Sequence, residues 1–187
     1  MTIDEKSSVV LIWIKYVFAP GTVASHENSS LRLGEIILGM NKNELEILKM
    51  YSIIQELQSD NSRLKKEAII KRESDADNKE FFEGCQLALD KLRTFGLKQV
   101  PKTYRDGEGI TWKEFKEVVK QLEERELTGN DARNKVEQLS DKSKKEEWND
   151  WYRNILIKDL RCGVTHKTIN KFSKYKVPVF DCMLATD

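Results

Sequence analysis

Apolar residues recur at helical spacing through most of this chain, and that pattern limits its fold more than any other feature. From Glu44 onward, apolar stripes alternate with polar or glycine-containing turns, such as Ser59–Asn61 and Thr128–Asn130. A charged fraction of 34% beside a hydrophobic fraction of 39% is typical of helices with solvated outer faces. No strand-rich stretch follows residue 40. The sequence therefore predicts an all-α, compact multi-helix fold.

The turns divide the chain into successive expected helices, and most of their apolar residues are expected to form the core. These helices run from Glu44 to Ser59, after Ser62, over Phe81–Leu92, after a cap at Thr111, over Ala132–Leu139, from Trp148 to a stop at Gly163, and from Thr165 to Phe172. Gly96 and Pro101 supply stop signals in the middle of the chain.

The two ends of the chain differ from its middle. Residues 1–39 combine a β-branched and aromatic run at Val9–Phe18 with a polar stretch, and we treat them as an N-terminal appendage without an assigned role. Residues 40–176 form the expected helical domain. Residues 177–187, which contain Pro178, read as an extended linker. The predicted organisation is thus one main domain with an appendage and a linker.

Targeting signals are weak in this sequence. The apolar run at Val9–Phe18 is broken by Lys15 and is shorter than the roughly 20 residues that a membrane span needs. Its start carries Asp4 and Glu5, balanced only by Lys6, whereas a signal peptide begins with positive charge. We therefore expect a cytoplasmic protein that does not enter a membrane.

Cysteine and histidine usage argues against metal and disulfide chemistry. Cys85, Cys162 and Cys182 are odd in number and widely spaced, which favours a reducing compartment. His26 and His166 are too far apart to form a metal cluster. The sequence predicts no metal site.

Motifs for catalysis are also missing from the sequence. The loop around Gly107 and Gly109 resembles a calcium-binding loop but has the wrong residues at the ligand positions. No phosphate-binding loop, dinucleotide fingerprint, nucleophile elbow or zinc-protease motif occurs. We therefore expect no catalytic residue in this chain.

A basic cluster near the C-terminal end is the most informative polar feature. Six cations lie between Ile157 and Lys176 and are opposed only by Asp159, a local charge of about +5. They are Lys158, Arg161, Lys167, Lys171, Lys174 and Lys176. The turn Cys162–Thr165 is expected to end one helix and begin the next, which would leave backbone N–H groups free beside these cations. Charge alone is compatible with two interpretations. The cluster is either a phosphate-binding site or a solvated basic face beside a common glycine C-cap.

Three segments resemble one known family in order and spacing. They are Glu126–Ala132 (ELTGNDA), Ile157–Thr165 (IKDLRCGVT) and Met183–Ala185 (MLA). Together they resemble the N-terminal DNA-binding domain of ATP-dependent DNA ligases, above all the bacteriophage members. The resemblance covers about residues 40–185 and is strongest from residue 126 onward.

This resemblance implies a helical domain that grips nicked double-stranded DNA across the minor groove, mainly through phosphates, and supports nick sealing in replication, repair and recombination. It places one DNA-contacting turn at Thr128, Gly129 and Asn130, and a second at Arg161, Gly163, Thr165 and Lys167. From charge, we add Lys171 and Lys174. We expect binding without base readout, by a monomer.

One departure from the family limits what the chain can do alone. The family's adenylating lysine belongs to a lysine-x-aspartate-glycine motif in the domain that follows the methionine-leucine-alanine segment. In this sequence Tyr104–Gly107 (YRDG) matches only the aspartate and glycine of that motif and has tyrosine in place of the lysine, so we interpret it as a coincidental match in a loop. The chain alone is therefore expected to be inactive and to hold no cofactor. ATP and Mg²⁺ are implied for the full-length ligase, with catalytic domains in the same polypeptide.

The alternative is a helical protein-interaction module that does not bind nucleic acid. In that case Trp148, Trp151 and Tyr152 would be partly exposed anchors for a partner helix.

Overall fold

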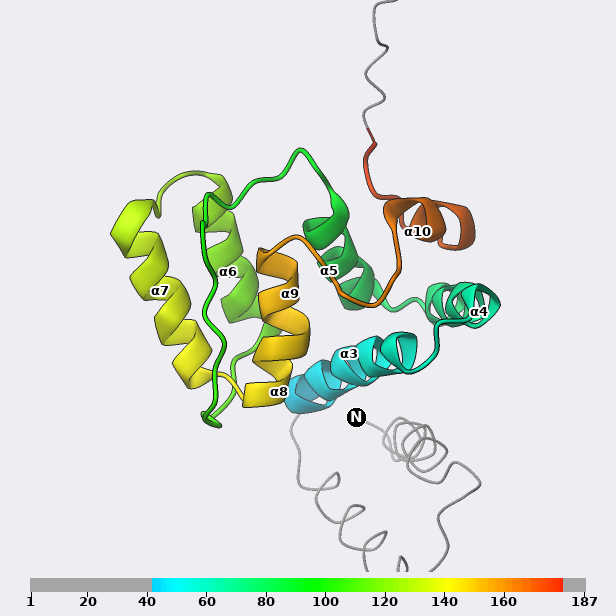
Figure 1. Ribbon diagram of the computed structural model, residues 1–187, viewed down its shortest axis with the longest axis horizontal. Helices are drawn as coiled ribbons and strands as arrows, with labels where there is room; N and C mark the ends of the chain where they lie inside the picture. Colours follow the sequence, from blue (N-terminus) through cyan, green and yellow to red (C-terminus); the bar gives the residue numbers. More distant parts are fainter. Residues whose placement is uncertain (1–41, 180–187) are drawn as a thin grey trace, which may run out of the picture. The chain divides into compact units, whose positions relative to one another are not determined.

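The structure is a computed structural model that describes residues 42–179 (Figure 1). The chain divides into two compact units, residues 1–49 and 50–187. The described part of the second unit is helical and contains no strand, which confirms the all-α prediction. The expected appendage at 1–39 and the Met183–Ala185 segment lie outside the described residues, so the predicted domain limits stay predictions.

The described elements follow the expected order along the chain. They are α3 (Lys42–Ser59), α4 (Arg63–Asp75), α5 (Lys79–Leu89), α6 (Trp112–Glu123), α7 (Gly129–Lys142), α8 (Lys145–Glu147), the π-helix η1 (Trp148–Tyr152), α9 (Arg153–Leu156) and α10 (His166–Phe172). Helix α5 packs against α9, α6 against α7, and α4 against α10. In Figure 1, α5 and α9 lie between the α6–α7 pair and the α4–α10 pair. None of the described helices is long and apolar enough to cross a membrane.

An aromatic cluster forms the centre of this unit. The π-helical turn η1 carries Trp148, Trp151 and Tyr152, and all three side chains are fully buried. The ring of Trp151 stacks on that of Phe81 with 5.8 Å between ring centres, and the ring of Tyr152 packs on that of Phe115 with 4.6 Å between ring centres. The expectation that the η1 aromatics are partly exposed anchors is therefore wrong, and the protein-interaction alternative loses its basis.

Helix α9 ends earlier than expected, and the prediction that Gly163 ends it is wrong. The helix stops at Leu156, where the N–H of Lys158 donates to the carbonyl of Ile155 and that of Asp159 to the carbonyl of Asn154, both at 3.0 Å. Lys158 has a φ of 63°, the left-handed conformation that glycine usually takes at this position. Gly163 lies further on, in the connection between α9 and α10.

Helix α5 also ends early, so the expectation that Leu92 belongs to its apolar stripe is wrong. The helix stops at Leu89, and the carboxylate of Asp90 accepts the N–H of Leu92 at 2.9 Å. This turn leaves the side chain of Leu92 58% exposed. The chain then runs without regular structure to Thr111.

Helix α6 begins with the predicted cap. The Thr111 hydroxyl accepts the N–H of Glu114 at 3.1 Å, and the Glu114 carboxylate accepts the N–H of Thr111 at 2.8 Å. Lys142 of α7 pairs with the same carboxylate at 2.7 Å. The bond from Lys142 and that from the Thr111 N–H lower the pKa of Glu114 from 4.5 to about 2.

We predict that Glu114→Ala lowers the free energy of unfolding by about 1 kcal/mol at pH 7, the usual contribution of a helix cap. The pKa of Glu114 is lowered by folding, so its contribution is complete above about pH 5 and is lost as the pH falls toward 2. Urea denaturation followed by circular dichroism at several pH values measures both effects. The control is Glu117→Ala, which removes an exposed carboxylate of α6 outside the cap. Equal losses for the two variants would contradict the prediction.

Candidate nucleic-acid interface

The turn around Gly163 lies on the surface. Arg161 and Gly163 have left-handed backbone conformations, with φ values of 53° and 69°, and both are exposed. The N–H of Arg161 donates to the carboxylate of Asp159 at 2.9 Å. Thr165 and Lys167 are exposed too, and the hydroxyl of Thr165 makes no capping bond with α10. The structure therefore brings four predicted site residues together on one accessible turn.

Lys66 of α4 joins this turn. Its Nζ lies 2.7 Å from the position that a Cβ atom on residue 163 would occupy. Because the φ of Gly163 is also left-handed, any other residue there would be strained and would displace the Lys66 ammonium. Sequence reasoning missed Lys66, since only the packing of α4 against α10 brings it here.

Lys158 contributes less to the basic cluster than its charge alone suggests. Its side chain is half-buried, and Nζ donates to the carbonyls of Leu87 at 2.6 Å and Asp90 at 2.5 Å. The ammonium also lies 5.1 Å from the centre of the Phe95 ring. Burial lowers the pKa of Lys158. Lys158 therefore links the end of α9 to the end of α5 by hydrogen bonds.

The cations in the last turn of α10 and just after it differ in their surroundings. Lys171 is exposed, lies over the ring of Phe172, and has no acid within ion-pair distance among residues 42–179. Lys174 forms an ion pair with Asp77, which leaves less of its charge for a ligand. Lys176 donates to two carbonyl groups near the end of α10. Of the two lysines that we added from charge, Lys171 is thus the better placed to meet an anion.

The second predicted turn precedes and begins α7. Thr128 is the N-cap residue of this helix, but its side chain makes no capping bond. Gly129 has a φ of 55°, and a Cβ there would meet open space. Thr128, Gly129 and Asn130 are all exposed. Figure 1 places α7 and α10 on opposite sides of the helical unit, so the two predicted turns are separate surfaces.

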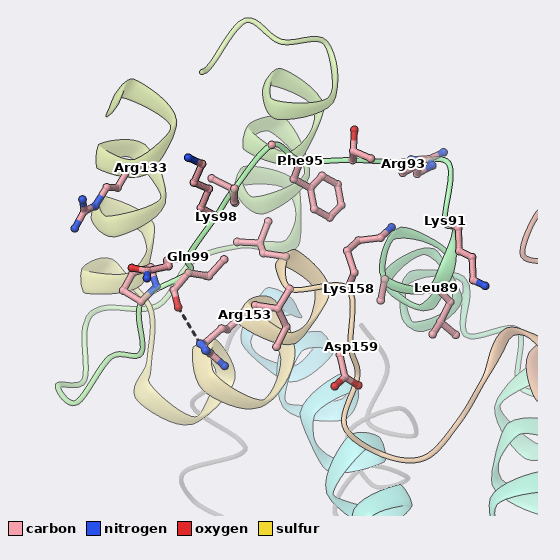
Figure 2. A pocket seen from close by; sticks show the side chains of 18 of the residues that line it. Leu89, Lys91, Arg93, Phe95, Lys98, Gln99, Arg133, Arg153, Lys158 and Asp159 are labelled. Atoms are coloured by element: carbon pink, nitrogen blue, oxygen red, sulfur yellow. Dashed lines mark hydrogen bonds between the residues drawn. The ribbon is translucent and has the colours of Figure 1, made fainter. Parts of the chain in front are cut away.

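A basic hollow of about 1070 Å³ lies between α7 and the residues Val164–His166 (Figure 2). Its walls come from the end of α5, the segment 91–101, α7, α9 and Val164–His166. Two acids line it, Glu137 and Asp159, against six cations. The cations are Lys91, Arg93, Lys98, Arg133, Arg153 and Lys158. We refer to this set of walls as the basic hollow.

Most cations of the basic hollow lack an acidic partner. Arg93 pairs with Asp90 at 3.4 Å and with Glu123 at 3.3 Å. Within the part of the chain that the structure describes, no carboxylate lies within ion-pair distance of the other three exposed cations. These are Lys91, Lys98 and Arg133. An anion in the hollow would therefore meet charge that the protein itself leaves unbalanced.

Arg153 is held in a fixed position in the wall of the basic hollow. Its Nε donates to the carbonyl of Val100 at 3.1 Å, the dashed line in Figure 2. Burial lowers the pKa of Arg153, and the positive charge of Arg161 lowers it further. Two guanidinium groups thus repel each other where the hollow approaches the Gly163 turn. Sequence reasoning assigned Arg153 no role, because it lies beside the buried aromatics of η1.

Metal chemistry finds no support in this region. Among the described residues, no three His, Cys, Asp or Glu side chains gather as possible metal ligands. Cys85 and Cys162 are buried free thiols, and burial raises the pKa of each. The structure is thus a helical domain with a hollow that is lined by more cations than acids.

Two solved structures are similar to this chain in both sequence and fold. Two solved chains, named "Pmar-Lig_Pre." and "Pmar-Lig_PreS3", are each 43% identical to this chain, with TM-scores of 0.70 and 0.69. The matches cover 74% and 71% of this chain but only 33% and 32% of those chains, so this chain spans about a third of their length. No protein-family model and no curated protein matches. The shared fold and identity indicate a protein related to DNA ligases.

Proposed function

We propose that this chain is the DNA-binding part of an ATP-dependent DNA ligase of the bacteriophage or bacterial type. It holds nicked double-stranded DNA through phosphate and minor-groove contacts and so supports nick sealing in replication, repair and recombination. The observation that carries the proposal is the basic hollow, which extends from α7 to Val164–His166 and presents cations that have no acidic partner among residues 42–179. The similarity to two ligase-named chains supports the same function.

The arrangement suits a polymer of phosphates better than a single small anion. Cations that form no ion pair within the described part of the chain are spread from Arg133 on α7, through Arg153, to Arg161 and Lys167 beyond the hollow. A duplex carries one charge about every 1.7 Å along its axis, so a broad basic surface can neutralise several phosphates at once. Each neutralised phosphate releases counterions, which makes binding strongly dependent on salt. Phosphate contacts carry no sequence information directly, so base preference is not expected.

The two predicted turns would then contact the duplex at separate places. The turn at Gly163 offers exposed cations, with Lys66 close beside it. The turn at Thr128–Asn130 offers a threonine whose hydroxyl makes no capping bond and a glycine with open space around it. Contacts on both sides of the hollow would fix the orientation of the DNA, as phosphate contacts do in protein–DNA complexes.

Sealing itself is assigned to other domains of the intact ligase, which would use ATP and Mg²⁺. The given sequence contains no lysine-x-aspartate-glycine motif. The partial match at Tyr104–Gly107 has a phenol in place of the lysine amine, and a phenol cannot form the lysyl–AMP bond. We propose that the chain acts as a monomer, in the cytoplasm, joined to those catalytic domains in one polypeptide. Alone, it is expected to bind DNA without sealing it.

Fluorescence anisotropy with a labelled nicked duplex tests the proposal. We expect a Kd in the micromolar range at low salt. For two to four phosphate contacts, affinity should fall roughly 10- to 100-fold between about 50 and 200 mM salt. No binding, or equal affinity at the two salt concentrations, would contradict the function. Incubation of the nicked duplex with ATP and Mg²⁺ should yield no sealed product, and sealing would show that the chain is itself an active ligase.

A further inference from the structure

Tyr104 is an aromatic side chain that the fold leaves on the surface. Tyr104 is 81% exposed, whereas aromatic residues usually pack in the core or at interfaces. Lys102 and Arg105, on either side of it in the sequence, are exposed as well. A large apolar ring between two cations is the composition of surfaces that bind single-stranded nucleic acid.

The chain before Tyr104 is firmly held by η1. The carbonyl of Pro101 accepts a hydrogen bond from the indole of Trp148 at 2.9 Å. The side chain of Asn149 accepts the N–H of Thr103 at 3.2 Å and donates to the carbonyl of Thr103 at 2.8 Å. Thr103 itself is buried. The exposed ring therefore follows directly after a fixed residue.

The chain after Tyr104 is held by the end of α7 and the start of α8. The carboxylate of Asp106 accepts the N–H of Lys145 at 3.0 Å, and the N–H of Gly107 donates to the carbonyl of Ser143 at 3.0 Å. Gly107 lies so close to the carbonyl of Lys142 that a Cβ atom would collide with it. Because both sides are anchored, Tyr104 loses little further freedom when it binds a ligand.

Tyr104 also lies near the cations of the proposed interface. Arg153, in the wall of the basic hollow, interacts electrostatically with both Tyr104 and Arg161. The neighbouring Val100 and Pro101 line the same hollow. The ring therefore follows Pro101 of the hollow's wall by three residues. Arg153 and Arg161, with which no acid of residues 42–179 forms an ion pair, would meet a phosphate backbone in the same region.

We propose that Tyr104 stacks on a DNA base that a gap or a single-stranded end leaves without a stacking neighbour. Every base offers a π-face, so this contact needs no particular sequence. Lys102, Arg105 and Arg153 would hold the backbone on either side of that base. The inference rests on the proposed function, since it assumes that DNA lies along the basic hollow, and it adds recognition of unpaired structure to phosphate binding.

Two DNA probes of one sequence test this stacking, an intact duplex and a duplex with a one-nucleotide gap. In anisotropy titrations of the full chain, Tyr104→Ala should bind the gapped probe about tenfold more weakly, the value of one modest base–aromatic stack. Its affinity for the intact duplex should change less than about twofold. Tyr104→Phe keeps the ring and should bind both probes like the unmodified chain. A 2-aminopurine base opposite the gap should be quenched by the unmodified chain and not by Tyr104→Ala.

Leu64→Ala is the matched control, because Leu64 is an exposed apolar side chain between two cations, Arg63 and Lys65, without a π-face and outside the basic hollow. It should leave both affinities unchanged. Equal losses on gapped and intact DNA for Tyr104→Ala, or no loss on either, would overturn the stacking while DNA binding by the unmodified chain still supported the proposed function. No binding of either probe by the unmodified chain would overturn both.

Discussion

Replacing Arg161 and Lys167 together with alanine should weaken binding of nicked duplex by about 10- to 100-fold at low salt. Both side chains are exposed, and neither pairs with an acid in residues 42–179, so their charge is available to phosphates. The slope of log K against log salt should become shallower by about 2, one for each lost contact. The circular dichroism spectrum and the urea midpoint should stay the same, because neither side chain contributes to the core.

A charge-matched control separates this turn from general electrostatics. Lys113→Ala together with Lys120→Ala also removes two positive charges, but from the exposed face of α6. That variant should keep nearly the full affinity and slope. An unchanged slope in the Arg161 and Lys167 variant would remove the Gly163 turn from the interface, and equal losses in both variants would mean that only net charge matters.

Replacing Trp151 with alanine should lower the free energy of unfolding by about 3–5 kcal/mol, because the change leaves a large cavity in the core. Trp151 is fully buried, stacks on Phe81 at 5.8 Å, and lies 6.0 Å from Trp112 between ring centres. It also packs so closely on Gly84 that a Cβ there would collide with the indole. A domain of ordinary stability, about 5–15 kcal/mol, would lose a large part of it.

Urea denaturation followed by circular dichroism measures this loss. Trp151→Phe should cost less than Trp151→Ala, since it keeps a ring and removes an indole N–H that has no hydrogen-bond partner among the described residues. Leu64→Ala, at a side chain in a residue that is 76% exposed, should change the stability by less than about 0.5 kcal/mol. A loss of less than about 1 kcal/mol for Trp151→Ala would contradict the central place of the η1 aromatics in the core.

Local signals in the sequence were sufficient for the helices and for most of their starts. Thr111 and Glu114 are three residues apart, the spacing of a capping box, and the structure forms that box. Thr165 likewise precedes α10. Such signals are readable because both partners lie within one turn of chain.

The helix ends were less predictable, because glycine does not mark them here. The left-handed residues after α4, α6 and α9 are Asp77, Arg125 and Lys158. Backbone bonds around each residue stabilise this conformation, and Arg125 and Lys158 lack the intrinsic preference for it that aspartate has. Because glycine is the usual signal for a helix end, the sequence predicted that the helix runs to Gly163, whereas α9 ends at Leu156.

The candidate site was only partly visible in the sequence for a related reason. Arg161, Gly163, Thr165 and Lys167 are close neighbours in the chain, so their shared turn could be predicted. Lys66 reaches that turn from almost 100 residues upstream, and the walls of the basic hollow come from several separate segments. The number of charges in a segment also does not show which cations are available to a ligand. Lys158 donates to two carbonyl groups, whereas other cations of the same segment face solvent.

The most direct test of the account is to map where DNA lies on the protein. Amide chemical shifts of the ¹⁵N-labelled full chain, recorded during titration with a nicked duplex, report which residues contact it. We expect the largest changes at Thr128–Asn130, in the segment 91–101 and at Arg161–Lys167, with little change on the exposed face of α6. Changes confined to other surfaces, or none at saturating DNA, would contradict the claim that the basic hollow and its flanking turns receive the phosphate backbone.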